Sequence, residues 1–243
     1  MVNTNALTSR RVEVSNSFDD IQDYYDELGW TDGLPVVPAT PDLVRKMLGE
    51  YGENPSWSLG VIQPQNASVN IEKVAINAVM AGCRPEHFPV VIAGIQAILK
   101  PEFNLAGCQA TTGGAAPVTI VNGPIARDLD INGDTGCFGP GHRSNAVIGR
   151  AIRLVIRNIA GLIPGEMDKA TLALPARYTF CFAENEARSP WEPRHVELGM
   201  EPDQSMVTIS AIRGLYVVME STVPTGLDVL KTLVESTQTT GFS

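Results

Sequence analysis

The chain has 243 residues, of which 44% are hydrophobic and 19% charged, and it holds 22 glycines and 17 prolines. The regular apolar content excludes a disordered or collagen-like chain, and the length allows one generous core or two small ones. There are 27 acidic against 18 basic side chains, a net charge of -9, and no Lys/Arg cluster longer than Arg10–Arg11. Such a chain has little with which to neutralise a phosphate backbone, so we expect no nucleic-acid partner.

We also expect no membrane partner. Residues 1–14 hold no apolar run, and the longest apolar stretches, 88–99 and 151–163, are too short or too interrupted by arginine to span a bilayer. A cytoplasmic location follows as an expectation. Because thiols stay reduced in that compartment, the four cysteines are predicted to be core, metal-ligating or reactive residues rather than disulfides.

Apolar periodicity predicts alternating helices and strands. Helices are expected after Ser17, after Thr40, from Asn70 to Gly82, and over 86–99, 143–163 and 226–237. Strands are expected at 34–37, 59–62, 118–121 and 178–182, with a hairpin over 206–212 and 215–219. The glycine-rich segments 104–114 and 131–141 are expected to be loops. This order predicts an α/β fold, a layered sheet with helices packed on it, which allows for two lobes.

For the domain organisation, we expect an N-terminal arm and helix over residues 1–29. Residues 30–243 are expected to form an α/β domain of the catalytic type. A junction between two lobes would lie near residues 100–140.

Three cysteines follow a glycine in a turn, at Gly82–Cys83, Gly107–Cys108 and Gly136–Cys137. A thiolate in such a turn is exposed and can be activated by nearby N–H groups, so Cys83 and Cys137 are candidate catalytic residues. Together, Cys83, Cys108 and Cys137 are candidate ligands of a transition metal or an iron–sulfur cluster, although their spacing matches no standard motif. The alternative is that each is a small buried hydrophobe, which we expect for Cys181.

The glycine-rich loop over residues 131–141 leads directly into the predicted helix that starts at residue 143. Gly139 and Gly141 let the backbone approach a ligand, and Arg143 can bind a carboxylate or phosphate in a bidentate way. We therefore predict an anion site that includes these residues together with His142 and Asn145. The alternative is a tight turn in which Asn145 or Ser144 caps the helix.

Two more groups of polar residues are candidates for a site. Glu184 and Glu186 leave a predicted strand, and His195 follows across a proline-stiffened turn, so these three can act as acid–base groups or as metal ligands. The alternative is a solvated carboxylate pair with a surface histidine. Thr111, Thr112 and Asn122 lie near strand ends, where side chains commonly line pockets, although ordinary turn chemistry explains them equally well.

Longer phrases of the sequence resemble a bacterial family whose members are largely uncharacterised. The phrases are Asp32–Pro38, Glu72–Cys83, Val121–Pro124, Gly139–Gly141, Asn145–Arg150 and Ala183–Trp191. Members occur beside, or fused to, proteins with a selenocysteine- or cysteine-Gly-Ser-Cys motif. The resemblance, over roughly residues 30–240, therefore implies an indirect link to sulfur or selenium redox chemistry and supplies no catalytic assignment.

The chain departs from that family at two places. Relatives carry an aliphatic residue near Cys108, and they continue beyond the region of Ser243. Against the family pattern, the end of the chain at Ser243 implies a split protein whose remaining core comes from a second chain.

We expect an enzyme for a small anionic substrate, with lyase, hydratase or reductive chemistry. The cofactor is open, with an iron–sulfur cluster or a transition metal as candidates. One alternative is a His/Glu metal-dependent hydrolase or lyase, and another is a non-catalytic subunit of a heteromeric enzyme. In each case we expect a homo- or hetero-oligomer.

Overall fold

A small mixed sheet and the helices packed beneath it organise the computed structural model, which describes residues 7–221 and 225–238. The central strand β3 (Ala116–Asn122) pairs in parallel with β4 (Cys181–Ala183) on one side and antiparallel with β5 (Met206–Ile212) on the other. A separate hairpin is formed by β1 (Ser58–Ile62) and β2 (Ala67–Asn70). The predicted α/β class is confirmed.

The longer helices follow the predicted order. The helices are α1 (Phe18–Glu27), α2 (Pro41–Leu48), α3 (Ile71–Met80), α4 (Phe88–Ile98), α5 (Leu105–Ala110), α6 (Pro124–Asp128), α7 (Arg143–Asn158), α8 (Arg194–Glu197) and α9 (Gly226–Thr237). Short 3-10 helices lie at Gly49–Glu53, Pro85–His87, Pro101–Phe103 and Pro175–Arg177. None of the helices among the described residues is long and apolar enough to cross a membrane.

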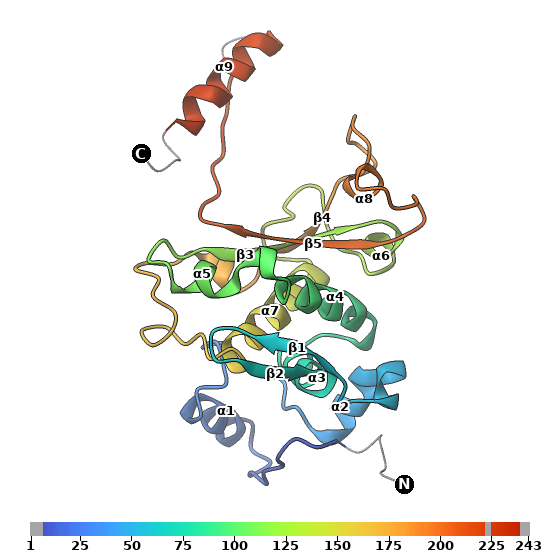
Figure 1. Ribbon diagram of the computed structural model, residues 1–243, viewed down its shortest axis with the longest axis vertical. Coiled ribbons are helices and arrows are strands. Elements are labelled where there is room, and N and C mark those ends of the chain that lie inside the picture. Colours follow the sequence, from blue (N-terminus) through green and yellow to red (C-terminus); the bar gives the residue numbers. More distant parts are fainter. Residues whose placement is uncertain (1–6, 222–224, 239–243) are drawn as a thin grey trace. The chain divides into compact units, whose positions relative to one another are not determined.

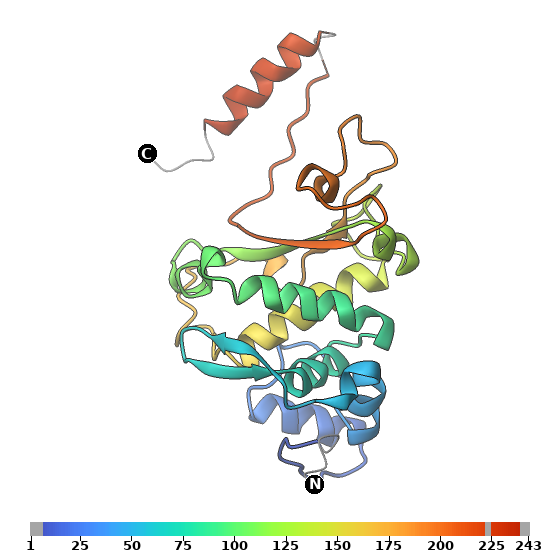
Figure 2. The same ribbon diagram turned by 45° about the vertical axis from the view of Figure 1, so that its right-hand side comes forward.

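Helices α4 and α7 lie side by side under one face of the sheet, and α3 packs below them (Figures 1 and 2). The arrangement follows from amphipathic spacing, because Ile148, Ile152 and Val155 line one side of α7 and are fully buried. Gly94 on α4 permits the close approach, since a Cβ there would lie 2.7 Å from Cδ1 of Ile152. The core therefore lies between the sheet and these helices.

Two predicted helix starts are confirmed in detail. The Thr40 side chain accepts a hydrogen bond from the backbone of Leu43, and Asn70 accepts one from Lys73. Each side chain satisfies one of the free N–H groups at the start of its helix.

Two strand predictions are wrong. Residues 34–37 form no strand, because the Gln22 side chain takes both backbone groups of Val36, and the N–H of Val37 donates to Met80 at the end of α3. Residues 215–219 form no hairpin with 206–212, since β5 pairs with β3 instead. The pattern also missed β2, α5, α6 and α8, which are short, and it placed β4 about three residues too early.

The chain divides into two units, Met1–Arg213 and Gly214–Ser243. The first holds both sheets and the core described above. The second, here called the C-terminal unit, contains an irregular segment over 214–221 and α9.

A buried carboxylate fixes the N-terminal segment to α3. Glu72 is 1% exposed and accepts hydrogen bonds from the Thr8 backbone and hydroxyl and from the Ser9 backbone, at 2.8–3.1 Å. Burial alone would raise the pKa of Glu72, but these hydrogen bonds outweigh it and hold the pKa below its usual value.

The lowered pKa gives a test of this contact. A carboxyl group whose pKa is lower in the folded state stabilises the fold above its unfolded pKa, about 4.3, and this stabilisation is lost as the pH falls below it. Glu72→Gln is therefore expected to lower the free energy of unfolding by about 1–3 kcal/mol at pH 7. The difference from wild type should shrink between pH 5 and 3, measured by urea unfolding. An equal difference at both pH values would contradict the assigned hydrogen bonds.

Candidate functional site

Four of the sequence-predicted residues come together at one end of the central sheet. Asn122 is the last residue of β3, Glu184 follows the last residue of β4, and Glu186 lies two residues further on. Because β3 and β4 are parallel, their carboxyl ends meet at the same edge, which is where α/β folds commonly place their sites. With His195 on α8, these residues form what we call the carboxylate–histidine cluster.

The Asn122 amide links the two carboxylates. Its Nδ2 donates to Oε2 of Glu184 at 2.5 Å and to Oε1 of Glu186 at 3.1 Å. Backbone N–H groups complete the arrangement, since Gly123 donates to Glu186 at 2.7 Å and Arg194 to Glu184 at 2.9 Å. Both carboxylates are therefore held in fixed positions by charge-assisted hydrogen bonds.

His195 lies beside Glu186 but is not hydrogen-bonded to it. Its Nδ1 is 3.7 Å from Oε1 of Glu186, and the residue is only 1% exposed. Pro193 precedes α8 in an extended conformation, so the proline-stiffened turn brings His195 back toward the carboxylates. His195 is thus buried beside Glu186, which overturns the alternative of a surface histidine.

Polar atoms of this cluster are left without partners. Across the described residues, five buried side-chain nitrogen or oxygen atoms lack a hydrogen bond, and three of them are Oδ1 of Asn122 and both ring nitrogens of His195. Buried polar groups are nearly always paired in folded proteins, and exceptions are concentrated where a ligand or a reaction needs them. The cluster is therefore the best candidate for a reactive site.

One exposed guanidinium lies near a carboxylate of the cluster, and two more lie on neighbouring residues of the chain. Arg127 on α6 lies 3.9 Å from Oε2 of Glu186, and Arg194 pairs with Glu197 on α8. Arg188 pairs with Asp134 in the glycine-rich loop at 3.5 Å. Exposed pairs of this kind are weak, so these arginines can exchange their partners for an incoming anion.

The glycine-rich loop touches the same edge of the sheet. Gly133 packs directly against the backbone of Ala183 and Glu184, where any Cβ would collide with the Ala183 carbonyl. Asn145 is 4% exposed and holds the loop by exchanging hydrogen bonds with the backbone of Asn132 and donating to Cys137. Asn145 thus positions the loop, and both its Oδ1 and its Nδ2 are engaged in these hydrogen bonds.

Other parts of the predicted anion site point elsewhere. Gly139 closes a turn onto Gly136, and Gly141 is exposed with a φ of +116°. His142 precedes α7 without capping it by its side chain. Arg143 donates to the Gly82 carbonyl at 3.0 Å, so its guanidinium binds the turn that holds Cys83.

The three Gly–Cys thiols do not form one site. Among the described residues there is no group of three or more His, Cys, Asp or Glu side chains that could hold a metal ion. Cys83 donates to the Val147 carbonyl, and burial raises the pKa of its thiol to about 12. Cys108 donates to Phe103, and burial raises its pKa as well. The residues present thus do not fit the expected iron–sulfur cluster, and Cys181 is buried as predicted.

The two carboxylates do not fit a metal centre either. No group of three or more candidate ligands forms here among the described residues, and one oxygen of each carboxylate, Oε2 of Glu184 and Oε1 of Glu186, accepts from the Asn122 amide and from backbone N–H groups, which would compete with a cation. The arrangement thus favours proton transfer over metal ligation.

Thr111 and Thr112 lie at the opposite end of β3 from Asn122. The Thr111 hydroxyl accepts from the Gly113 backbone, and the Thr112 carbonyl accepts from Thr171. The first contact is ordinary turn chemistry and the second is a long-range backbone contact, and neither joins these threonines to Asn122 in one pocket.

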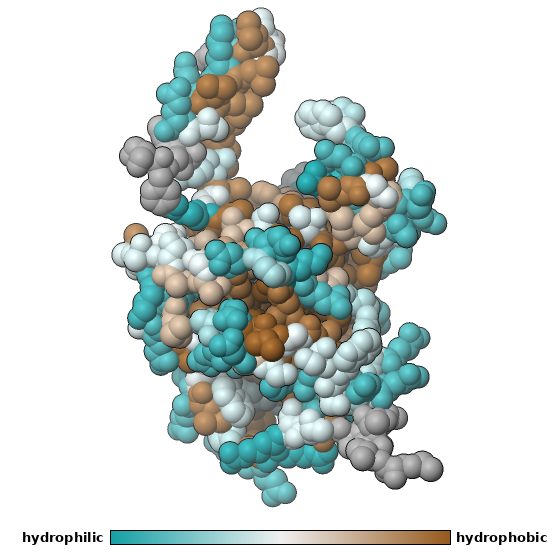
Figure 3. Space-filling model, viewed as in Figure 1, coloured by the Kyte–Doolittle hydropathy of each residue, from teal (hydrophilic) through white to brown (hydrophobic). Residues whose placement is uncertain are grey.

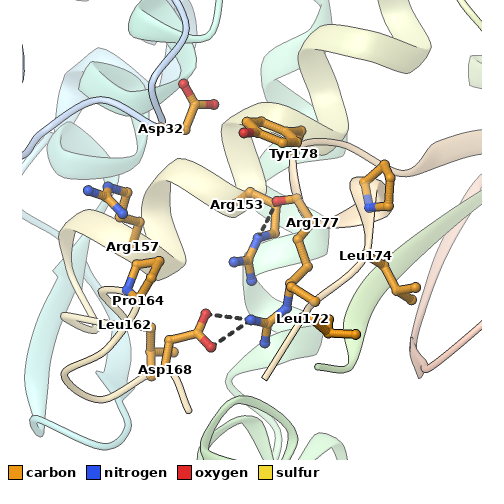
Figure 4. A pocket seen from close by; sticks show the side chains of 12 residues that line it. Asp32, Arg153, Arg157, Leu162, Pro164, Asp168, Leu172, Leu174, Arg177 and Tyr178 are labelled. Atoms are coloured by element: carbon orange, nitrogen blue, oxygen red, sulfur yellow. Dashed lines mark hydrogen bonds and ion pairs between the residues drawn. The ribbon is translucent and has the colours of Figure 1, made fainter. Parts of the chain in front are cut away.

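A cavity of about 410 Å³, which sequence reasoning missed, is lined by several arginines (Figure 4). We call it the arginine pocket, and its charged lining consists of Asp32, Arg153, Arg157, Asp168 and Arg177. The signal in the sequence was the spacing of Arg150, Arg153 and Arg157, which places three guanidiniums near one face of α7.

No protein family, curated protein or solved structure matched the chain in the three comparisons made.

Proposed function

We propose that the chain is an acid–base enzyme of the lyase or hydratase type that acts on a small anionic substrate at the carboxylate–histidine cluster. The observation that carries the proposal is the set of unpartnered buried atoms on Asn122 and His195 beside two fixed carboxylates. A site prepared for proton transfer needs a base, an acid and a group that orients the substrate, and the cluster offers all three.

The roles follow from the contacts. Glu186 takes a proton from a carbon next to a carboxylate, while His195 supplies a proton to the departing hydroxyl, so that a C–H and a C–O bond break, a C=C bond forms and water leaves. The reverse sequence is hydration. Oδ1 of Asn122 accepts a hydrogen bond from the substrate hydroxyl, and Arg127 with Arg194 attracts the carboxylate of the substrate.

Reductive chemistry is not supported by the thiols. At pH 7 a thiol with a pKa of about 12, as at Cys83, is almost entirely protonated, whereas the thiolate is the reactive form. The backbone of Cys137 is held by Asn145 and Asp134, and among the described residues its thiol has no activating partner on which to base a redox step. We therefore assign proton transfer to the glutamates and histidine and no redox step to the cysteines.

Hydrogen–deuterium exchange tests the proposal without knowledge of the substrate. The protein is incubated in D₂O with a panel of small 2-hydroxy, 3-hydroxy and 2-oxo acids, and proton NMR follows loss of the signal at the acidic carbon. At least one compound should exchange faster with wild type than with buffer, and Glu186→Gln should abolish the gain. Glu192→Gln, an exposed glutamate in the same turn, is the matched control. Exchange in no compound, or in all variants equally, would contradict the proposal.

A second candidate is that the chain works as a subunit of an oligomer, and the C-terminal unit favours it. Val217 is 86% and Met219 80% exposed. Leu227, Leu230 and Val234 lie at helical spacing on α9 and are also exposed, and Figure 3 shows apolar side chains gathered along one side of this helix. Apolar surface of this kind is typical of a protein–protein contact.

The oligomer is tested by sedimentation velocity at micromolar concentration. We expect the wild-type chain to sediment as a dimer or larger, because α9 would bury its apolar side against another chain. Leu230→Asp should shift it to the monomer, whereas Lys231→Gln, on an adjacent and more polar position, should not. A wild-type monomer across this concentration range would contradict self-association.

A further inference from the structure

The arginine pocket is a site distinct from the carboxylate–histidine cluster. Arg177 in the pocket donates to the carbonyl of Ala115, just before β3, whereas Asn122 ends that strand. Seven residues of extended chain span about 20 Å, so one small molecule cannot reach both sites.

The carboxylates that line the pocket are already neutralised. Arg177 binds both oxygens of Asp168 at 2.5 and 2.6 Å, in a pair with side chains 8% and 3% exposed. Arg150 binds both oxygens of Asp32 at 2.8 Å. Neither carboxylate is therefore available to the remaining guanidiniums.

Arg153 and Arg157 take part in none of the ion pairs of the described residues. Among the described residues no carboxylate pairs with either side chain, and the Nε atom of Arg157 is buried without a hydrogen-bond partner. Arg153 donates only to neutral oxygens, those of Gln109 and the Arg177 backbone. Burial, together with the charge of Arg177, lowers the pKa of Arg153 to about 10, which leaves it charged at pH 7. In a chain with a net charge of -9, this is a local excess of positive charge in a cavity.

The rest of the lining is apolar and belongs to the loop after α7. It consists of Leu162, Pro164, Leu172, Ala173, Leu174, Pro175 and Tyr178. Figure 4 shows Arg153 and Arg157 projecting from α7 and Arg177 approaching from the facing segment. A volume of about 410 Å³ is of the size that holds a small organic ligand.

We propose that the arginine pocket binds a small organic anion, a carboxylate or phosphate group carried on an apolar body. The oxyanion lies between Arg153 and Arg157, where Arg157 can donate a pair of hydrogen bonds and Arg153 can donate from Nη2, since its Nε and Nη1 already bind the Arg177 carbonyl and Gln109. The apolar body lies against the leucine, proline and tyrosine side chains. This site goes beyond the proposed function, because it involves none of the residues assigned to proton transfer.

Isothermal titration calorimetry at low ionic strength tests the proposal with benzoate and phenyl phosphate as probes. The affinity for inorganic phosphate gives the contribution of the anion alone, and the affinity for benzyl alcohol gives that of the apolar body alone. Benzoate or phenyl phosphate should bind more tightly than either, and the affinity should fall as salt is added. Equal binding of benzyl alcohol, or no binding of either aromatic anion, would overturn the proposal.

Variants assign the binding to the pocket. Arg157→Gln should weaken the binding of the aromatic anion by about tenfold or more, since it removes a charged donor. The affinity of Arg157→Lys for the aromatic anion should lie between those of Arg157→Gln and wild type. Because Arg157 has no described partner, thermal unfolding of the unliganded Arg157→Gln protein should match wild type. Arg45→Gln, which removes an exposed guanidinium on α2, should bind like wild type. Unchanged affinity in Arg157→Gln would overturn the proposal.

Discussion

Arg177→Met is expected to destabilise the fold by about 3–5 kcal/mol, because it leaves the buried carboxylate of Asp168 without its partner. The same change removes the donors that serve the Ala115 carbonyl and the side chain of Gln109. These groups are buried around the start of β3. The loss should be measured as the free energy of unfolding from urea titrations at pH 7.

A second variant separates two contributions to this loss of stability, the unpaired buried charge and the lost packing of the Arg177 side chain. Asp168→Asn in the Arg177→Met background removes the buried charge while keeping an oxygen for the Ala170 N–H. The double variant should recover part of the loss, because the cost lies mainly in the isolated carboxylate. A loss below about 1 kcal/mol in the single variant, or no recovery in the double, would show that this ion pair does not hold the segment after α7.

Glu186→Gln and His195→Gln are each expected to slow the reaction at the cluster by about 10²- to 10⁴-fold. Glu186 lies 3.7 Å from His195, so the two groups act together and their effects should not add. The double variant should be about as slow as the slower single variant. Rates are compared for the substrate that the exchange panel identifies, after circular dichroism has shown that each variant is folded.

The control for this pair is Glu192→Gln. Glu192 is exposed in the proline-rich turn that precedes His195. Its substitution removes the same charge as Glu186→Gln, but at a residue with no described contact to the cluster. It should keep the wild-type rate. Additive losses in the double variant, or a comparable loss in Glu192→Gln, would mean that general electrostatics rather than a proton-transfer pair sets the rate.

Local pattern predicted the longer helices and the residues at the edge of the sheet. Thr40 and Asn70 were recognisable as caps because a short polar side chain precedes an apolar periodic run. Asn122 and Glu184 were recognisable as strand-end residues. The parallel pairing of β3 with β4 joins residues that are about sixty positions apart in the sequence, and no local pattern specifies such a pairing.

Burial explains the failures at the candidate site. Gly82–Cys83 reads as an exposed turn, yet the thiol lies against α7 and donates to Val147. Arg143 looks free to bind an anion, but the same packing places it on the Gly82 carbonyl. Arg177 completes the arginine pocket from a segment far from Arg153 in the sequence, so only the tertiary structure could place them together.

Whether the carboxylate–histidine cluster is catalytic is decided by the rate of deuterium exchange at the acidic carbon of the best panel compound, compared between Glu186→Gln and Glu192→Gln. The carboxylate–histidine cluster predicts a wild-type rate in Glu192→Gln and a loss of at least about 10²-fold in Glu186→Gln. Equal rates in the two variants would contradict a catalytic role for the cluster.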